Sequence, residues 1–247
     1  MAGISVHQDD LELTEPTMIE GFPGVGLVGK IATDHLIDTF DMTYYATIRC
    51  EGLPRIGIYH DGDRSVKPPV RLYADEEHDL LALQSDVPVP KQAAGSMTDC
   101  LTGWIETEGI TPIYLSGYPQ EERSVPPALY GIASGNAGGW LDEIDVDPPG
   151  EDGAVGGPTG ALLSEAAARR IDAVGLVVET NPQFPDPEAA RSLIDGAIEP
   201  LLEFDVPVEE LIEHAEQIRE QREALAKQLQ AADEGESTKA QPLRMFQ

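Results

Sequence analysis

The chain has 247 residues and a formal net charge of −29, from 16 Lys and Arg against 45 Asp and Glu. This negative charge repels phosphate backbones and anionic lipid headgroups, which argues against nucleic acids and membrane surfaces as partners. The length and the 41% hydrophobic content suffice for one large domain, or two small ones, with a real core.

The basic residues are unevenly divided between the two types, with five lysines and eleven arginines. A carboxylate-covered surface that avoids lysine suits high salt, because dense counterions screen the repulsion among its charges. The alternative is an ordinary acidic protein, which would be equally stable in low and molar KCl. Residues 1–10 have neither a basic region nor an apolar stretch of secretory length, and no later run approaches about 20 apolar residues. We therefore expect a salt-adapted protein of the cytoplasm.

Runs of β-branched, aromatic and aliphatic residues alternate along the chain with longer segments typical of helices. Strands are expected at residues 17–19, 43–49, 55–59, 70–73, 80–84, 112–115 and 173–179. Helices are expected at residues 26–40, 92–108, 160–171 and 187–203. The last strand is a continuous apolar run, AVGLVVE, which suits a sheet buried on both faces. Strands and helices mixed in this way predict an α/β fold.

A glycine-rich segment, GFPGVGLVGK at residues 21–30, lies between the first expected strand and the first expected helix. Glycine permits positive φ angles and the close approach of an anion, and a helix N-terminus behind it offers unpaired N–H groups. Gly24, Gly26 and Gly29 satisfy the G-x-G-x-x-G pattern of dinucleotide sites, and Glu51 follows at a suitable separation. This spacing favours a Rossmann-type site.

The same segment also satisfies a second phosphate-binding pattern, G-x-x-x-x-G-K, from Gly24 to Lys30. That pattern requires a Ser or Thr hydroxyl next, to hold magnesium, but Ile31 occupies the position and cannot ligate metal. In the third interpretation the glycines only allow tight packing of the loop and helix against a sheet. The sequence leaves the three interpretations open.

A second glycine-rich segment, GAVGGPTGALL at residues 153–163, repeats the theme past the middle of the chain. Gly156, Gly157 and Gly160 supply backbone freedom, and Thr159 is expected to be the N-cap of the following helix. The two segments together form a candidate site for a small anionic ligand, or a place of close packing.

Three motifs follow one another along the chain: GFPGVGLVG at 21–29, GGPTGALL at 156–163 and NPQFPDPEAARSLI at 181–194. In this order and at these separations they resemble the proteasome assembly chaperone family, and specifically an archaeal, haloarchaeal-type member. The resemblance implies a three-layer α/β/α sandwich related to the nucleoside-phosphorylase-like fold. It also implies a protein that binds partners instead of catalysing a reaction, with no cofactor.

One α/β core domain is expected over residues 1–207, since the strand and helix pattern resumes after the Pro-, Gly- and acid-rich connection at 145–157. A long helix is expected over 208–232, with an apolar seam in a highly charged surface. The seam would pack on its own domain, on a partner helix or on another subunit. Its residues are Leu211, Ala215, Ile218, Leu225 and Leu229.

The segment 233–247 begins with the polar composition of a flexible tether and ends in Leu-Arg-Met-Phe-Gln. An apolar tip with a terminal carboxylate suits a docking peptide. The family resemblance implies insertion between proteasome α-subunits, where related tails end in a hydrophobic residue, Tyr and any residue. Met245, Phe246 and Gln247 are similar, but Phe lacks the Tyr hydroxyl, a difference of roughly 0.5–1.5 kcal/mol in affinity. The alternative is a frayed end.

Catalytic and metal-binding patterns are weak. The five histidines are scattered outside any metal-ligand motif, and Cys50 and Cys100, expected to be reduced, have no C-x-x-C spacing. Ser116 lacks the G-x-S-x-G elbow, and Glu179 at a strand end is either a polar site residue or a loop-capping carboxylate. We expect no catalytic residue and no metal site.

The sequence therefore favours a chaperone or adaptor, not an enzyme, that binds core-proteasome α-subunits or an α-ring and forms a homo-oligomer. A nucleotide- or phosphometabolite-binding enzyme that uses the two glycine segments is the alternative. A third possibility is a structural homo-oligomer.

Overall fold

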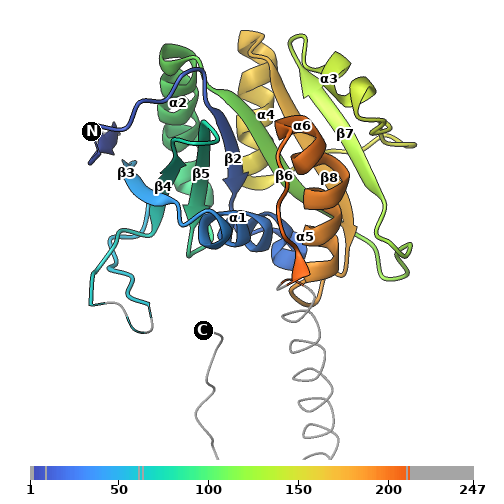
Figure 1. The fold of residues 1–247 in the computed structure, drawn as a ribbon, viewed down its shortest axis with the longest axis horizontal. Helices are drawn as coiled ribbons and strands as arrows, with labels where there is room; N and C mark the ends of the chain where they lie inside the picture. The colour runs from blue at the N-terminus through green and yellow to red at the C-terminus, as the bar shows by residue number, and fades with distance from the viewer. Residues whose placement is uncertain (1–2, 9, 61, 63, 210, 212–247) are drawn as a thin grey trace, which may run out of the picture.

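The computed structural model describes residues 3–8, 10–60, 62, 64–209 and 211. Their centre is an eight-stranded sheet of order β1-β3-β4-β5-β2-β6-β8-β7 (Figure 1). The strands are β1 (Gly3–Val6), β2 (Thr17–Gly21), β3 (Thr43–Arg49), β4 (Val70–Asp75), β5 (Leu80–Ser85), β6 (Thr111–Pro119), β7 (Leu129–Ser134) and β8 (Ala173–Thr180).

The middle of the sheet is parallel, because β5, β2, β6 and β8 run in one direction. The outer strands β1, β3, β4 and β7 join it in antiparallel pairs. Successive residues of the central strands enter two separate cores: in β5, Leu80 and Ala82 face one, and Leu81 and Leu83 the other. Burial on both faces explains the continuous apolar runs in the sequence.

Helices cover both faces of the sheet, as the expected α/β architecture requires. The first core contains residues of α1 (Val28–Thr39), α5 (Pro187–Leu193) and the short α3 (Gly138–Glu143), with α6 (Glu199–Leu202) packed against it. The second core contains residues of α2 (Lys91–Glu108) and α4 (Gly157–Arg169). Figure 1 shows the two helical layers on opposite sides of the sheet. The nucleoside-phosphorylase-like resemblance stays a prediction.

The strand expected at 55–59 is wrong. Its only ladder-like contact among the described residues is an isolated bridge between Ile58 and Lys67 within the long connection from β3 to β4. Because β3 and β5 already occupy both edges of β4, the segment cannot pair with the strand that follows it in the chain. The helix expected at 187–203 is interrupted by a π-helical turn, Ile194–Ile198. Pro200 follows it and has no N–H for a regular helical bond.

The described chain ends where the expected C-terminal helix begins. Val208 and Leu211 pack against the first core, so the first residue of the apolar seam is buried in its own domain. The rest of the expected helix and the tail, residues 212–247, lie outside the described residues. Among the described helices, none combines the length and the apolar character needed to cross a bilayer.

Candidate functional site

The parallel strands β2, β6 and β8 end at Gly21, Pro119 and Thr180, and ligands of α/β sheets bind at such carboxyl ends. The first glycine segment follows β2 here. One turn of 3-10 helix, Val25–Leu27, leads from it into α1. A ligand site is therefore expected at the carboxyl end of the sheet.

The first glycine segment packs directly on the neighbouring strands. Gly26 has a φ of +63°, and a Cβ atom there would lie 2.0 Å from Oγ1 of Thr180. A Cβ on Gly117 of β6 would lie 2.4 Å from the carbonyl oxygen of Val25. A Cβ on Gly29 would lie 3.2 Å from Cβ of Leu115. Protein atoms thus fill the space beside these glycines, which favours the packing interpretation over a phosphate cradle.

Asp186 holds the glycine segment against β8. Its N–H donates to the Gly26 carbonyl oxygen at 2.9 Å. Its Oδ2 accepts from Oγ1 of Thr180 at 3.1 Å and from the N–H of Asn181 at 3.0 Å. Its Oδ1 lies 3.1 Å from Nη2 of Arg123. Asp186, in the third sequence motif, therefore fixes the position of Gly26, in the first motif, beside Thr180.

The sequence analysis missed the role of Asp186, although a local signal was present. Asp186 is the N-cap of α5 and accepts from the N–H of Ala189 at 3.2 Å. Pro187 follows it, and an Asp before a Pro at the first helical position is a typical helix start.

Glu20 joins the two glycine segments. It lies in β2, is fully buried, and its Oε1 accepts from the Phe22 N–H at 2.8 Å and from Oγ1 of Thr159 at 3.1 Å. Its Oε2 is buried and has no hydrogen-bond partner among the described residues. Burial disfavours the charged form and raises the pKa of Glu20 to about 7. Sequence reasoning could not find this contact, because the partners are 139 residues apart.

The expectation that Thr159 is an N-cap is wrong. α4 begins two residues earlier, at Gly157, and Gly156 is its N-cap. Since the Thr159 hydroxyl bonds Glu20, it serves the contact between segments and not the helix end. A Cβ on Gly160 would lie 2.0 Å from the Val155 carbonyl oxygen, so this glycine too is required for close packing.

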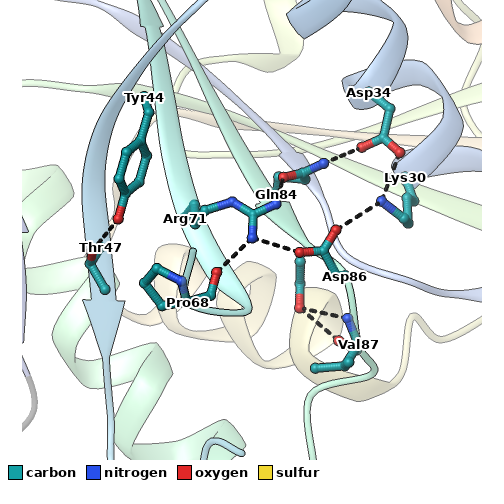
Figure 2. Close-up of polar contacts among 10 residues, drawn as sticks. Lys30, Asp34, Tyr44, Thr47, Pro68, Arg71, Gln84, Asp86 and Val87 are labelled. Carbon is teal, nitrogen blue, oxygen red and sulfur yellow. Dashed lines mark hydrogen bonds and ion pairs between the residues drawn. The ribbon is translucent and has the colours of Figure 1, made fainter. Parts of the chain in front are cut away.

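Lys30, the lysine of the phosphate-binding pattern, belongs to a partly buried ionic network (Figure 2). Its Nζ lies 2.7 Å from Oδ2 of Asp34 and 3.8 Å from Oδ1 of Asp86. Asp86 also pairs with the fully buried Arg71 at 2.6 Å. Gln84 connects the two ion pairs. Its Oε1 accepts from Nη2 of Arg71 at 2.5 Å, and its Nε2 donates to Oδ1 of Asp34 at 2.7 Å. Two cations thus balance two carboxylates, and Lys30 is engaged by protein groups.

Glu51, the acidic residue of the dinucleotide pattern, lies elsewhere. It is exposed, and its carbonyl oxygen accepts from Oγ of Ser96 in α2 at 2.9 Å. α2 covers the face of the sheet opposite α1, so the fold does not bring Glu51 to the first glycine segment.

Glu179 caps a loop. Its Oε2 accepts from the N–H and the hydroxyl of Ser124 at 2.9 and 2.8 Å. These bonds, the backbone one foremost, favour the charged form and lower the pKa of Glu179.

The remaining sequence candidates divide into three groups. Cys50 and Cys100 are half-buried free thiols. Within the described part of the chain, no group of three His, Cys, Asp or Glu residues could hold a metal ion. Met245, Phe246 and Gln247 lie outside the described residues.

The fold and this site define a class of α/β protein in which packed glycine segments occupy the carboxyl end of a mixed sheet. The same architecture occurs in PbaA of Pyrococcus furiosus, an archaeal homologue of proteasome-assembly chaperone, with a TM-score of 0.79 and 25% identity over 94% of this chain and 100% of that chain. It also occurs in PbaB of the same organism, an archaeal proteasome activator, with a TM-score of 0.75 and 23% identity over 92% of this chain and 98% of that chain.

A family model described as the PAC2 family matches residues 18–226, so the chain belongs to the PAC2 family. An uncharacterized protein of Methanocaldococcus jannaschii is 27% identical over 233 residues, which cover 90% of each chain.

Proposed function

We propose that this protein is a proteasome assembly chaperone or adaptor that binds core-proteasome α-subunits or an α-ring, without catalysis. Membership of the PAC2 family carries the proposal, and the likeness to PbaA and PbaB supports it. The packed glycine segments support a binding role, because Thr180, Leu115 and neighbouring backbone take up the space that a phosphate would need.

The C-terminal tail is the proposed docking element. Met245, Phe246 and Gln247 would enter a pocket between α-subunits, with the terminal carboxylate held by a basic group. The ring of Phe246 supplies the apolar contact, and the missing Tyr hydroxyl weakens it by roughly 0.5–1.5 kcal/mol.

The test is binding to purified core-proteasome α-rings in molar KCl, with the intact chain compared with a chain ending at Pro242. We expect the intact chain to bind and the shortened chain to lose most of its affinity. Phe246→Ala should reproduce this loss. Phe246→Tyr should tighten binding by about two- to thirteenfold, because it restores the hydroxyl hydrogen bond. Equal binding by both chains would move recognition to the globular body, and no binding by either would refute the proposal.

The proposal includes a salt-adapted cytoplasmic protein that forms a homo-oligomer. The charge of −29 and the shortage of lysine support the salt adaptation, since a high ionic strength screens the repulsion. Stability against urea should rise from low to molar KCl, and equal stability in the two would contradict it.

The nucleotide- or phosphometabolite-binding alternative has less support. Protein atoms crowd Gly26, Gly29 and Gly160, so these positions would have to open before an anion could enter. Gly24 has only one atom within 4 Å, at 3.9 Å, and Gly156 and Gly157 have none, so the backbone beside these three is not filled. A thermal-shift screen with nucleotides and phosphorylated sugars tests this directly, and stabilisation by one of them would favour the alternative.

A further inference from the structure

The chain has two cysteines, and the fold brings them together although they lie far apart in the sequence. Cys50 directly follows β3, and Cys100 lies in the middle of α2. Both are free, half-buried thiols. The Cys50 thiol donates a hydrogen bond to the sulfur of Cys100. The thiol of each cysteine is therefore a direct neighbour of the other.

A tight turn, residues 50–53, seats Cys50 on α2. A backbone hydrogen bond of 3.3 Å between its first and last residues closes the turn. Oγ of Ser96 donates to the carbonyl oxygen of Glu51 at 2.9 Å. A Cβ on Gly52, whose φ is +88°, would lie 3.1 Å from Cα of Ala93. The backbones of the turn and of the helix thus meet with no room for a side chain between them.

The turn meets α2 in a consistent register. Its contacts fall on Ala93, Ser96 and Cys100, which are three and four residues apart and so lie on one face of the helix. Along the turn, the matching positions are 52, 51 and 50, in that order. The contact between the thiols is the third in this series. The packing of the whole turn on the helix therefore holds the two sulfurs together.

We propose that Cys50 and Cys100 form a modification site, which a low-molecular-weight disulfide such as oxidised glutathione converts into an intramolecular disulfide. The new bond staples the 50–53 turn to α2 and closes a loop of chain that contains β4 and β5. In a reducing compartment the pair stays as two thiols, so the disulfide forms only under oxidising conditions. The inference goes beyond the proposed function and does not depend on proteasome binding.

Two thiol–disulfide exchanges carry the reaction. The Cys100 thiolate keeps the hydrogen bond from Cys50 and attacks one sulfur of the oxidant, which releases one thiolate and leaves a mixed disulfide. Cys50 then gives up its proton, attacks the sulfur of Cys100 and releases the second thiolate. The two protons of the pair end on the two released thiols. The cysteines are oxidised, and the small disulfide is reduced.

The surroundings of the pair allow this exchange but make it slow. Cys50 lines a cavity of about 700 Å³, which leaves room for the oxidant beside the pair. Burial raises the pKa of both thiols, so little thiolate is present at neutral pH. The extent of oxidation at equilibrium is therefore the quantity to measure, and not its rate.

The test equilibrates the full chain, in molar KCl, with buffers of increasing ratio of oxidised to reduced glutathione. Remaining thiols are blocked with N-ethylmaleimide, and the products are identified by mass spectrometry. Both thiols should disappear together and give a peptide crosslinked between Cys50 and Cys100. The mixed disulfide with glutathione should be at least about a hundredfold less abundant, because contact gives the pair a high effective concentration. Cys50→Ser and Cys100→Ser should each give only the mixed disulfide.

A second pair of variants tests the seating of the turn. Ser96→Ala removes the hydrogen bond to Glu51 and should lower the ratio of intramolecular to mixed disulfide by about two- to thirteenfold. The matched control is Thr107→Ala in the same helix, which removes a bond of 2.8 Å to the carbonyl oxygen of Gly103 within α2. This control should leave the ratio unchanged.

Oxidation should also stabilise the chain. A bond between two distant segments constrains the unfolded chain, so the equilibrium constant for unfolding in urea should fall roughly 30- to 1,000-fold. Added reductant should reverse this change. The single-cysteine variants should show no such fall under the same oxidant.

The outcomes decide the proposal. Two thiols that stay free at every ratio, or that give only mixed disulfides or disulfides between chains, overturn it. A crosslink that appears only after the chain has been unfolded overturns it as well, because the folded structure would then not bring the thiols together. Since the peptide map of the wild-type chain needs no variant, it decides the question even where a variant fails to fold.

Discussion

Replacement of Glu20 by Gln should stabilise the protein at neutral pH and leave it unchanged in acid. Glu20 is fully buried, its Oε2 is unpartnered among the described residues, and burial raises its pKa from 4.5 to about 7. The amide of Gln keeps an oxygen that accepts from Phe22 and Thr159. It removes the charge that burial penalises.

The magnitude follows from the difference between the two pKa values, 7 minus 4.5, or about 2.5 units. At 1.36 kcal/mol per unit, the ionised carboxylate costs about 3 kcal/mol of stability above pH 7. Because the folded-state pKa of Glu20 lies above its unfolded value, the protonated Glu20 side chain makes its full contribution to stability below pH 4.5. It is lost as the pH rises to about 7. The gain of Glu20→Gln should therefore grow from near zero to about 3 kcal/mol across this window.

The assay is urea unfolding of the wild type and the variant in molar KCl, at several pH values from 4.5 to 8. The difference between the two free energies of unfolding cancels the titration of all other groups. Glu179→Gln is the matched control, because its pKa is lowered by its bonds from Ser124 and it should destabilise at neutral pH. A difference for Glu20→Gln that stays constant with pH would refute the reasoning.

Three further predictions concern the same part of the molecule. Gly26→Ala should destabilise by about 2 kcal/mol or more, because its φ is +63° and a Cβ would lie 2.0 Å from Oγ1 of Thr180. Gly103→Ala in α2 should instead stabilise the protein by up to about 1 kcal/mol, because a Cβ there would have no atom within 4 Å and alanine favours the helix. If thermal unfolding shows Gly26→Ala to be the more stable variant, the packing interpretation is contradicted. Asp186→Ala should lower the free energy of unfolding in urea by about 2–4 kcal/mol, because it removes the N-cap of α5 and leaves Arg123 partly unpaired. A loss below about 1 kcal/mol would show that the glycine segment does not depend on Asp186. Burial raises the pKa of the Cys50 thiol to about 12, so iodoacetamide should modify it at pH 8 far more slowly than a free thiol, and rapid labelling of the folded protein would be inconsistent with this environment.

The central elements were predictable because their signals are local. The strand expected at 173–179 is β8, Ala173–Thr180, and the helix expected at 92–108 is α2, Lys91–Glu108. The pattern that predicts each of them, an apolar run for β8 and a helical period for α2, lies within one continuous stretch of sequence. Elements whose sequence shows only part of such a pattern were missed.

The missed strands lie at the two edges of the sheet. β1 has four residues, and β7, LYGIAS, contains a glycine and is only partly buried. A short or half-buried strand shows little alternation, and only its pairing with β3 or β8 stabilises it. The opposite error, a strand at 55–59, has the same origin: the composition is strand-like, but a composition does not supply a partner strand, and the segment forms only the isolated bridge from Ile58 to Lys67.

The sequence by itself determined the α/β class, the negative net charge and the order of the three motifs. Those properties depend on composition and on neighbouring residues. Only the tertiary structure decided what the glycines face, because Thr180 and Leu115 come from strands far along the chain. It also decided that Glu20 is buried against Thr159. Burial, pKa and surface charge depend on contacts between distant segments, and a linear pattern does not contain those contacts.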